Sequence, residues 1–277
     1  MKKLLLPLLF ISFMAQGQND KKYDLVWKVS DTLRYETNMD VVQLQDDKDS
    51  EEETDSIRSK AKEFFKKWSD SNQNKKYGVK LYPDTKGNID IAMHIVEQEN
   101  DSADFFSAFA KMNGNVILRG KISKEGALEG FYYKTDQNNL TAILFELPTH
   151  PVAVGESWPL QINLINMDQN FVADSSARRN EVRLEKVIDR NGEKIAVLSY
   201  DILEYAAGAF GNPMMKEFLQ QGSEDRFYLK MTHTGTAEFS VDRGCWLTYN
   251  AVMEMDTNTG FMGAGGSQTN FHLELLE

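Results

Sequence analysis

Apolar and polar residues alternate with a two-residue period over much of this chain, a pattern typical of strands in a sheet covered on one face. Near the beginning, residues 23–44 alternate in two runs separated by a turn at 30–31. The glycine-containing segments 189–192 and 242–244 are typical of β-hairpin turns. Beyond residue 150 the alternation predicts long strands over 157–166, 177–188, 193–205, 227–241, 245–256 and 267–276.

The first half also contains segments with the period of an α-helix. Residues 50–68 place Phe64, Phe65 and Trp68 on one apolar stripe, after a start that resembles a capping box. In residues 102–112, Phe105 and Phe109 share a face. Residues 138–147 have helical spacing but are ambiguous between helix and strand. Two hairpins are expected between these segments, at 77–83 with 88–96 and at 116–122 with 128–133.

Together these patterns predict an α+β fold that is predominantly β. We expect a curved antiparallel sheet, similar to a half-barrel, with two or three helices packed on one face. Residues 18–150 make an N-terminal α+β half and 151–277 a C-terminal antiparallel β half. The two halves are expected to form one continuous domain or two tightly packed lobes.

The first seventeen residues have the pattern of a secretory signal peptide. Lys2 and Lys3 precede an apolar run, Leu4 to Met14, and the small residues Ala15 and Gly17 suit cleavage before Gln18. We therefore expect an exported protein, periplasmic or secreted. No cysteine follows the apolar run, so it is not expected to be a lipoprotein. No later apolar run is long enough to span a membrane.

Charge and cysteine content narrow the classes of partner and site. The formal net charge is −11, with no basic stripe, which argues against nucleic acid. The single cysteine, Cys245, allows no intramolecular disulfide and is expected to be a buried core residue. The four histidines show no zinc spacing, and the glycine cluster 260–266 is followed by a predicted strand where a nucleotide loop requires a helix. We expect no catalytic residues, metal or cofactor.

Three hypotheses about function follow. In the first, a lipid or other apolar ligand binds between helices and sheet, against Phe64, Trp68, Phe105, Phe109 and His233, the last of which lies on the apolar face of its strand. In the second, the chain is a non-enzymatic module that binds an envelope protein through its sheet edges and the loop 207–226. The third, ranked last, is a hydrolase that uses His233 with nearby carboxylates.

One segment resembles a known family. Leu147-Pro148 and the PVAVGESW run 151–158 are similar to an "LP–PV–VG–SW" signature of an uncharacterised family of exported Bacteroidetes proteins. Thr234 to Phe239, followed by Gly244 to Trp246, is similar to a second motif of that family. The resemblance implies a sheet with helices on one face, a layout similar to periplasmic lipoprotein carriers of the LolA/LolB type. It implies no particular activity.

Overall fold

The protein is described by a computed structural model over residues 21–43, 76–96, 116–129, 135–167, 169–211, 226–258 and 266–276. The predicted signal peptide and the predicted helices 50–68 and 102–112 lie outside these residues. In the described part the fold is predominantly β, with one short helix, α3, at Thr135–Phe145. That helix resolves the ambiguity of residues 138–147, and Pro148 follows soon after its end.

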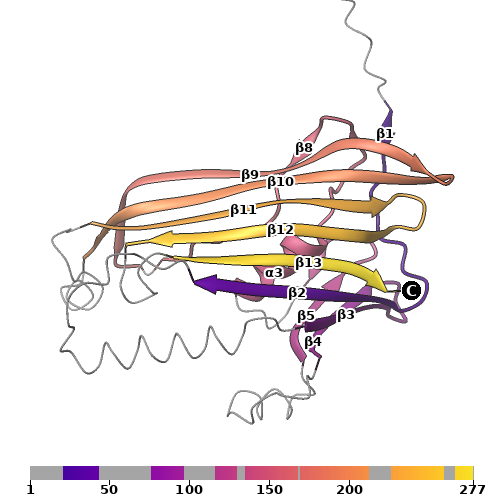
Figure 1. Ribbon diagram of the computed structural model, residues 1–277, viewed down its shortest axis with the longest axis horizontal. Coiled ribbons are helices and arrows are strands. Elements are labelled where there is room, and N and C mark those ends of the chain that lie inside the picture. Colours follow the sequence, from indigo (N-terminus) through magenta and orange to yellow (C-terminus); the bar gives the residue numbers. More distant parts are fainter. Residues whose placement is uncertain are drawn as a thin grey trace, which may run out of the picture.

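Eleven strands of the described chain form one antiparallel sheet, in the order β6-β5-β4-β3-β2-β13-β12-β11-β10-β9-β8 (Figure 1). A separate two-stranded sheet pairs β1 (Lys22–Tyr23) with β7 (Val152–Ala153). The strands of the large sheet, in chain order, are β2 (Leu33–Gln43), β3 (Lys76–Pro83), β4 (Ile89–Ile95), β5 (Val116–Ile122), β6 (Leu128–Glu129), β8 (Ser157–Trp158), β9 (Phe171–Arg190), β10 (Glu193–Phe210), β11 (Phe227–Ser240), β12 (Cys245–Thr257) and β13 (Ser267–Leu276).

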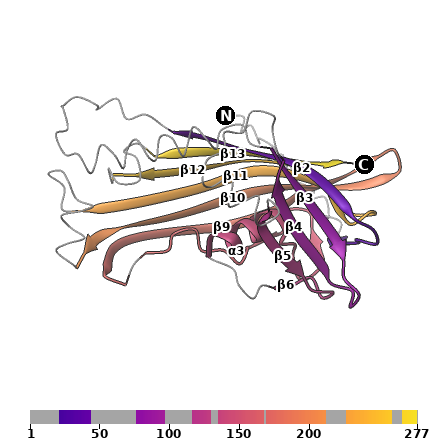
Figure 2. The same cartoon turned by 90° about the horizontal axis from the view of Figure 1, so that it is seen from below.

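The expected half-barrel is wrong, because the sheet is neither closed nor strongly curled. Its two ends, β6 and β8, are two-residue strands that pair only inward, with β5 and β9. The short strands β3 to β5 run obliquely to the long strands, and α3 lies in the angle between them (Figure 2). The sheet therefore twists and remains open.

The pairing of β2 with β13 joins the beginning of the chain to its end (Figure 1). Strand β2 spans Leu33 to Gln43, but β3 pairs with it only from Leu33 to Asn38. The C-terminal strand β13 supplies the second neighbour from Arg34 to Gln43. The described residues of both predicted halves thus contribute to one continuous sheet.

The predicted hairpin 77–83 with 88–96 is confirmed as β3–β4. The hairpin 116–122 with 128–133 is confirmed as β5–β6 over its described part, and residues 130–133 lie outside it. The 189–192 turn is confirmed as well, since Asn191 and Gly192 both have positive φ values, 57° and 86°. That geometry belongs to a two-residue turn whose twist matches that of the flanking strands. Only residues that tolerate left-handed backbone fit there, as asparagine and glycine do.

Several predicted boundaries are wrong. Residues 24–30 alternate like a strand but form none. Their apolar side chains still pack against the protein, since Leu25 is buried and Trp27 is half-buried. The strand predicted at 157–166 stops at Trp158, and the following segment bonds to the sheet through side chains. Strand β10 extends through Phe210, into the predicted loop 207–226, of which residues 212–225 lie outside the described chain.

Candidate functional site

Two tryptophans form hydrogen bonds with the C-terminal end of α3, next to the face of the sheet that the helix covers. Trp246 Nε1 donates to the carbonyl oxygen of Leu144 at 2.7 Å, and Trp27 Nε1 donates to that of Phe145 at 3.0 Å. The last carbonyls of a helix have no partner within it, so these indoles satisfy them. The two indole rings meet edge to face, with centroids 6.0 Å apart. This contact fixes where α3 covers the sheet.

His233 lies on the same face, in a buried aromatic cluster formed with Tyr200, Tyr249 and Phe271. The side chain of His233 is fully buried, and its Nε2 lies 2.5 Å from the hydroxyl oxygen of Tyr249. The rings of Tyr200 and Phe271 meet the imidazole edge-on, at centroid distances of 6.2 and 5.7 Å. We call these four residues the His233 cluster.

The strand register explains why these side chains meet. Tyr200 is opposite Gly235 on β11, and Gly235 is opposite Ala251 on β12. A Cβ atom on Gly235 would lie 2.5 Å from the Cβ of Ala251, so no larger residue fits at this position. The small residues leave room beside them for the large rings. The Tyr200 and Tyr249 rings accordingly meet edge to face, 5.1 Å apart.

Two polar atoms of the cluster, Nδ1 of His233 and the hydroxyl of Tyr200, are buried and have no hydrogen-bond partner among the described residues. Burial without compensation lowers the pKa of His233 to about 4, so the imidazole is neutral at pH 7. Burial, followed by the charge of Glu146, raises the pKa of Tyr200. The cluster therefore offers uncharged hydrogen-bonding groups inside an apolar layer.

An apolar strip extends along the same face from His233. Met231 and Met255 are opposite each other one row beyond the His233–Met253 pair. They pack against a second core cluster formed by Phe210, Phe227 and Leu229. Methionine side chains are flexible and adapt to varied apolar shapes. We call Met231, Met255, Phe210, Phe227 and Leu229 the methionine–phenylalanine strip.

Of the residues predicted to line a ligand site, only His233 lies in the described chain. Phe64, Trp68, Phe105 and Phe109 fall outside it, so their expected place beside His233 stays a prediction. Sequence reasoning did not select Tyr200 or Tyr249. The alternation of β10 and β12 places both on the apolar face, but it does not show that their rings surround one histidine.

A small cleft lies elsewhere, between the β3–β4 and β5–β6 turns and the chain around Trp27. Its volume is about 150 Å³, and its lining includes Gly87, Lys124 and Pro148. Ligand pockets usually occupy roughly 300–1,000 Å³. The cleft is therefore too small to hold a typical organic ligand in this structure.

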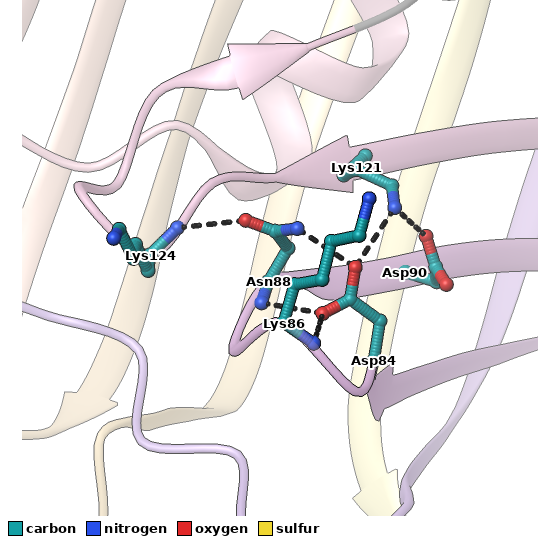
Figure 3. Close-up of polar contacts among 6 residues, drawn as sticks. All are labelled: Asp84, Lys86, Asn88, Asp90, Lys121 and Lys124. Carbon is teal, nitrogen blue, oxygen red and sulfur yellow. Dashed lines mark hydrogen bonds and ion pairs between the residues drawn. The ribbon is translucent and has the colours of Figure 1, made fainter.

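A polar network beside the cleft has a structural role (Figure 3). The Asp84 carboxylate accepts bonds from the backbone N–H groups of Lys86 and Asn88 at 2.7 and 2.8 Å. Lys121 then bridges Asp84 and Asp90 at 3.1 and 3.0 Å. The hydrogen bond from the side chain of Asn88 is the main cause that lowers the pKa of Asp84. These contacts close the turn and tie it to β5.

Neither a metal-binding group nor a membrane-spanning helix is present in the described ranges. Those ranges contain no group of three or more His, Cys, Asp or Glu side chains placed to hold a metal ion. None of their helices combines the length and apolar character needed to cross a bilayer. Cys245 is buried with a free thiol, whose pKa burial raises.

No family model matches the chain, and no curated protein matches it with significance.

Proposed function

We propose that this chain is an exported, non-enzymatic protein that holds an amphipathic ligand on the face of the sheet that α3 covers. The observation that carries the proposal is the pair of unpartnered polar atoms in the His233 cluster. A buried polar group without a partner costs stability. A ligand that hydrogen-bonds to both atoms would remove that cost.

The surroundings favour an uncharged polar group on the ligand. His233 is neutral, and burial keeps Tyr200 protonated, so a charged group would enter an apolar layer without a counter-charge beside these atoms. Because Nδ1 of His233 and the Tyr200 hydroxyl can each donate or accept, a ligand hydroxyl or amide suits them. The apolar part of the ligand would lie along the methionine–phenylalanine strip.

The predicted signal peptide and the family resemblance support export, and both remain part of the proposal. The likeness to LolA/LolB-type carriers gives less support, because the described sheet is not a half-barrel. The ligand proposal therefore depends on the His233 cluster and not on the overall layout.

Native mass spectrometry of the protein purified from its own envelope, followed by organic extraction, tests the proposal. We expect a stoichiometric bound lipid or similar molecule, released on denaturation. A clean unliganded mass, together with no binding of fluorescent fatty-acid or phospholipid probes, would overturn the proposal.

A matched pair of variants separates binding from folding. Tyr200→Phe removes only an unpartnered hydroxyl, so stability is expected to stay equal or to rise by about 1 kcal/mol while ligand occupancy falls. Tyr249→Phe removes the hydroxyl bonded to His233 and is expected to lower stability by about 1–3 kcal/mol. Urea denaturation measures the change in stability, and the mass spectra measure the change in ligand occupancy. Undiminished occupancy in Tyr200→Phe would contradict the assigned polar contact.

The second candidate, a module that binds another envelope protein through its sheet edges, is favoured by one observation. Residues 172–179 of β9, at one end of the sheet, are all exposed. An exposed strand edge presents backbone groups that another chain can pair with.

A further inference from the structure

The face of the sheet that α3 covers also carries a buried carboxylate, that of Glu204 on β10. The residue is 5% exposed. Its Oε2 accepts a hydrogen bond from the backbone N–H of Ile165 at 2.9 Å. Its Oε1 is buried and has no hydrogen-bond partner among the described residues. Because a buried carboxylate oxygen without a donor costs stability, a ligand group that donates to Oε1 would be favoured there.

The strand register places Glu204 beside the His233 cluster. Ile202 is opposite His233. Tyr200 and Glu204 lie two residues to either side of Ile202, on the same face of β10. They are therefore the diagonal neighbours of His233 across the strand pair. Glu204 is itself opposite Met231, so it belongs to the row where the His233 cluster meets the methionine–phenylalanine strip.

Arg178 balances the charge of this carboxylate but does not satisfy Oε1. Its Nε lies 3.3 Å from Oε1, an ion pair that lacks hydrogen-bond geometry. Its Nη2 donates instead to the carbonyl oxygen of Ile162. A cationic ligand group would therefore bring an unbalanced charge into the apolar layer, and an anionic group would be repelled by Glu204. A neutral donor, such as a hydroxyl, suits this position.

The polar atoms that a ligand would meet are spread along the strand. Glu204 is four residues from Tyr200, so their Cα atoms lie roughly 13 Å apart at about 3.3 Å per residue. A head group with a single hydroxyl has one position for all of these atoms. A head group with several hydroxyls can place one beside Glu204 and another beside Nδ1 of His233 or the hydroxyl of Tyr200.

We propose that the ligand is a neutral amphiphile whose head group carries two or more hydroxyls, as a glycerol or a sugar does, with one hydroxyl donating to Glu204. The inference rests on the proposed function and names the class of ligand. The alkyl chain would lie along the methionine–phenylalanine strip, from Met231 onwards. A fatty acid has the same kind of chain but brings a second carboxylate to this layer, so it is expected to bind more weakly.

Isothermal titration calorimetry of the purified protein, with ligands that share one alkyl chain length, tests the proposal. The probes are monododecanoylglycerol, dodecyl glucoside, dodecanol and dodecanoic acid, each below its solubility limit. We expect at least one of the two probes with several hydroxyls to bind on the order of tenfold more tightly than dodecanol and dodecanoic acid, the effect of one hydrogen bond to a charged group.

The probes also separate this inference from the ligand proposal. Binding without the expected preference would overturn the inference and leave the ligand proposal standing. No binding of any probe would overturn the inference as well, while the native mass spectra decide the ligand proposal independently.

Glu204→Gln and a matched control locate the contact. The variant keeps a side-chain oxygen for the N–H of Ile165 but replaces Oε1 by a donor, so the preference for several hydroxyls should fall on the order of tenfold. Asp201→Asn removes a carboxylate that pairs with Arg179 on the opposite face of β10, and it should leave binding unchanged. Thermal unfolding checks that both variants remain folded. An unchanged preference in folded Glu204→Gln, or an equal loss in Asp201→Asn, would overturn the assigned contact. The comparison of probes on the wild-type protein holds even if Glu204→Gln does not fold.

Discussion

His233 shows how burial at a single residue sets a property of the whole molecule. On an exposed loop this imidazole would exchange a proton near neutral pH. In the fold it is fully buried among aromatic rings, and desolvation lowers its pKa from 6.5 to about 4. The folded state therefore excludes a proton that the unfolded chain binds, and this difference links stability to pH.

Stability is expected to fall as the pH decreases from about 6.5 to 4. In that window the unfolded chain is protonated at His233 while the folded chain is not, so protons favour unfolding. The free energy of unfolding falls by about 3 kcal/mol in total over this window. Above pH 6.5 the contribution of His233 does not change with pH. Urea denaturation at a series of pH values measures it. His233→Gln should flatten the slope.

At the scale of elements, α3 is tied to the chain that follows it by reciprocal bonds. Asn139 Nδ2 donates to the carbonyl of Asn163 at 2.7 Å, and Asn163 N donates to Oδ1 of Asn139 at 2.8 Å. The segment around Asn163 was predicted to be a strand, and these bonds satisfy backbone groups that a ladder would otherwise satisfy. One buried asparagine thus replaces part of a strand pairing.

Asn139→Ala is expected to destabilise the protein by about 2 kcal/mol, because the buried side chain of Asn139 no longer makes its two hydrogen bonds with the backbone of Asn163. The neighbouring Asn138 is exposed, so Asn138→Ala should change stability by less than about 0.5 kcal/mol. The midpoints of urea denaturation give the comparison. Equal losses in the two variants would contradict the assigned role of Asn139.

At the scale of the whole molecule, the sheet joins residues distant in sequence. Strand β2, near the beginning of the chain, pairs along its length with the C-terminal β13. Trp27 packs edge to face on Phe239 and Trp246, more than 200 residues later. The two predicted halves share these contacts, so disruption of one is expected to disrupt the other.

We therefore expect unfolding in a single cooperative transition. Far-UV circular dichroism reports the sheet and tryptophan fluorescence reports side-chain packing, and the two curves should coincide. A first transition in one signal that leaves the other unchanged would show that the halves unfold separately.

The sequence by itself determined most strands and one of the tight turns. Alternation along 193–205, 227–241 and 245–256 places one side of each strand in the core, and the register confirms this. The turn at Asn191-Gly192 was predictable because few residues adopt positive φ. Such features depend on neighbours along the chain, so local pattern is enough to identify them.

Only the tertiary structure decided the sheet order, its open shape and the surroundings of His233. Alternation at 24–30 and 157–166 indicated strands, but whether a ladder forms depends on what lies opposite. That β13 pairs with β2, and that Tyr200 and Tyr249 surround His233, follows from contacts between residues distant in sequence. Periodicity shows which face of a strand is buried, whereas the partner on that face is set by the packing of the whole chain.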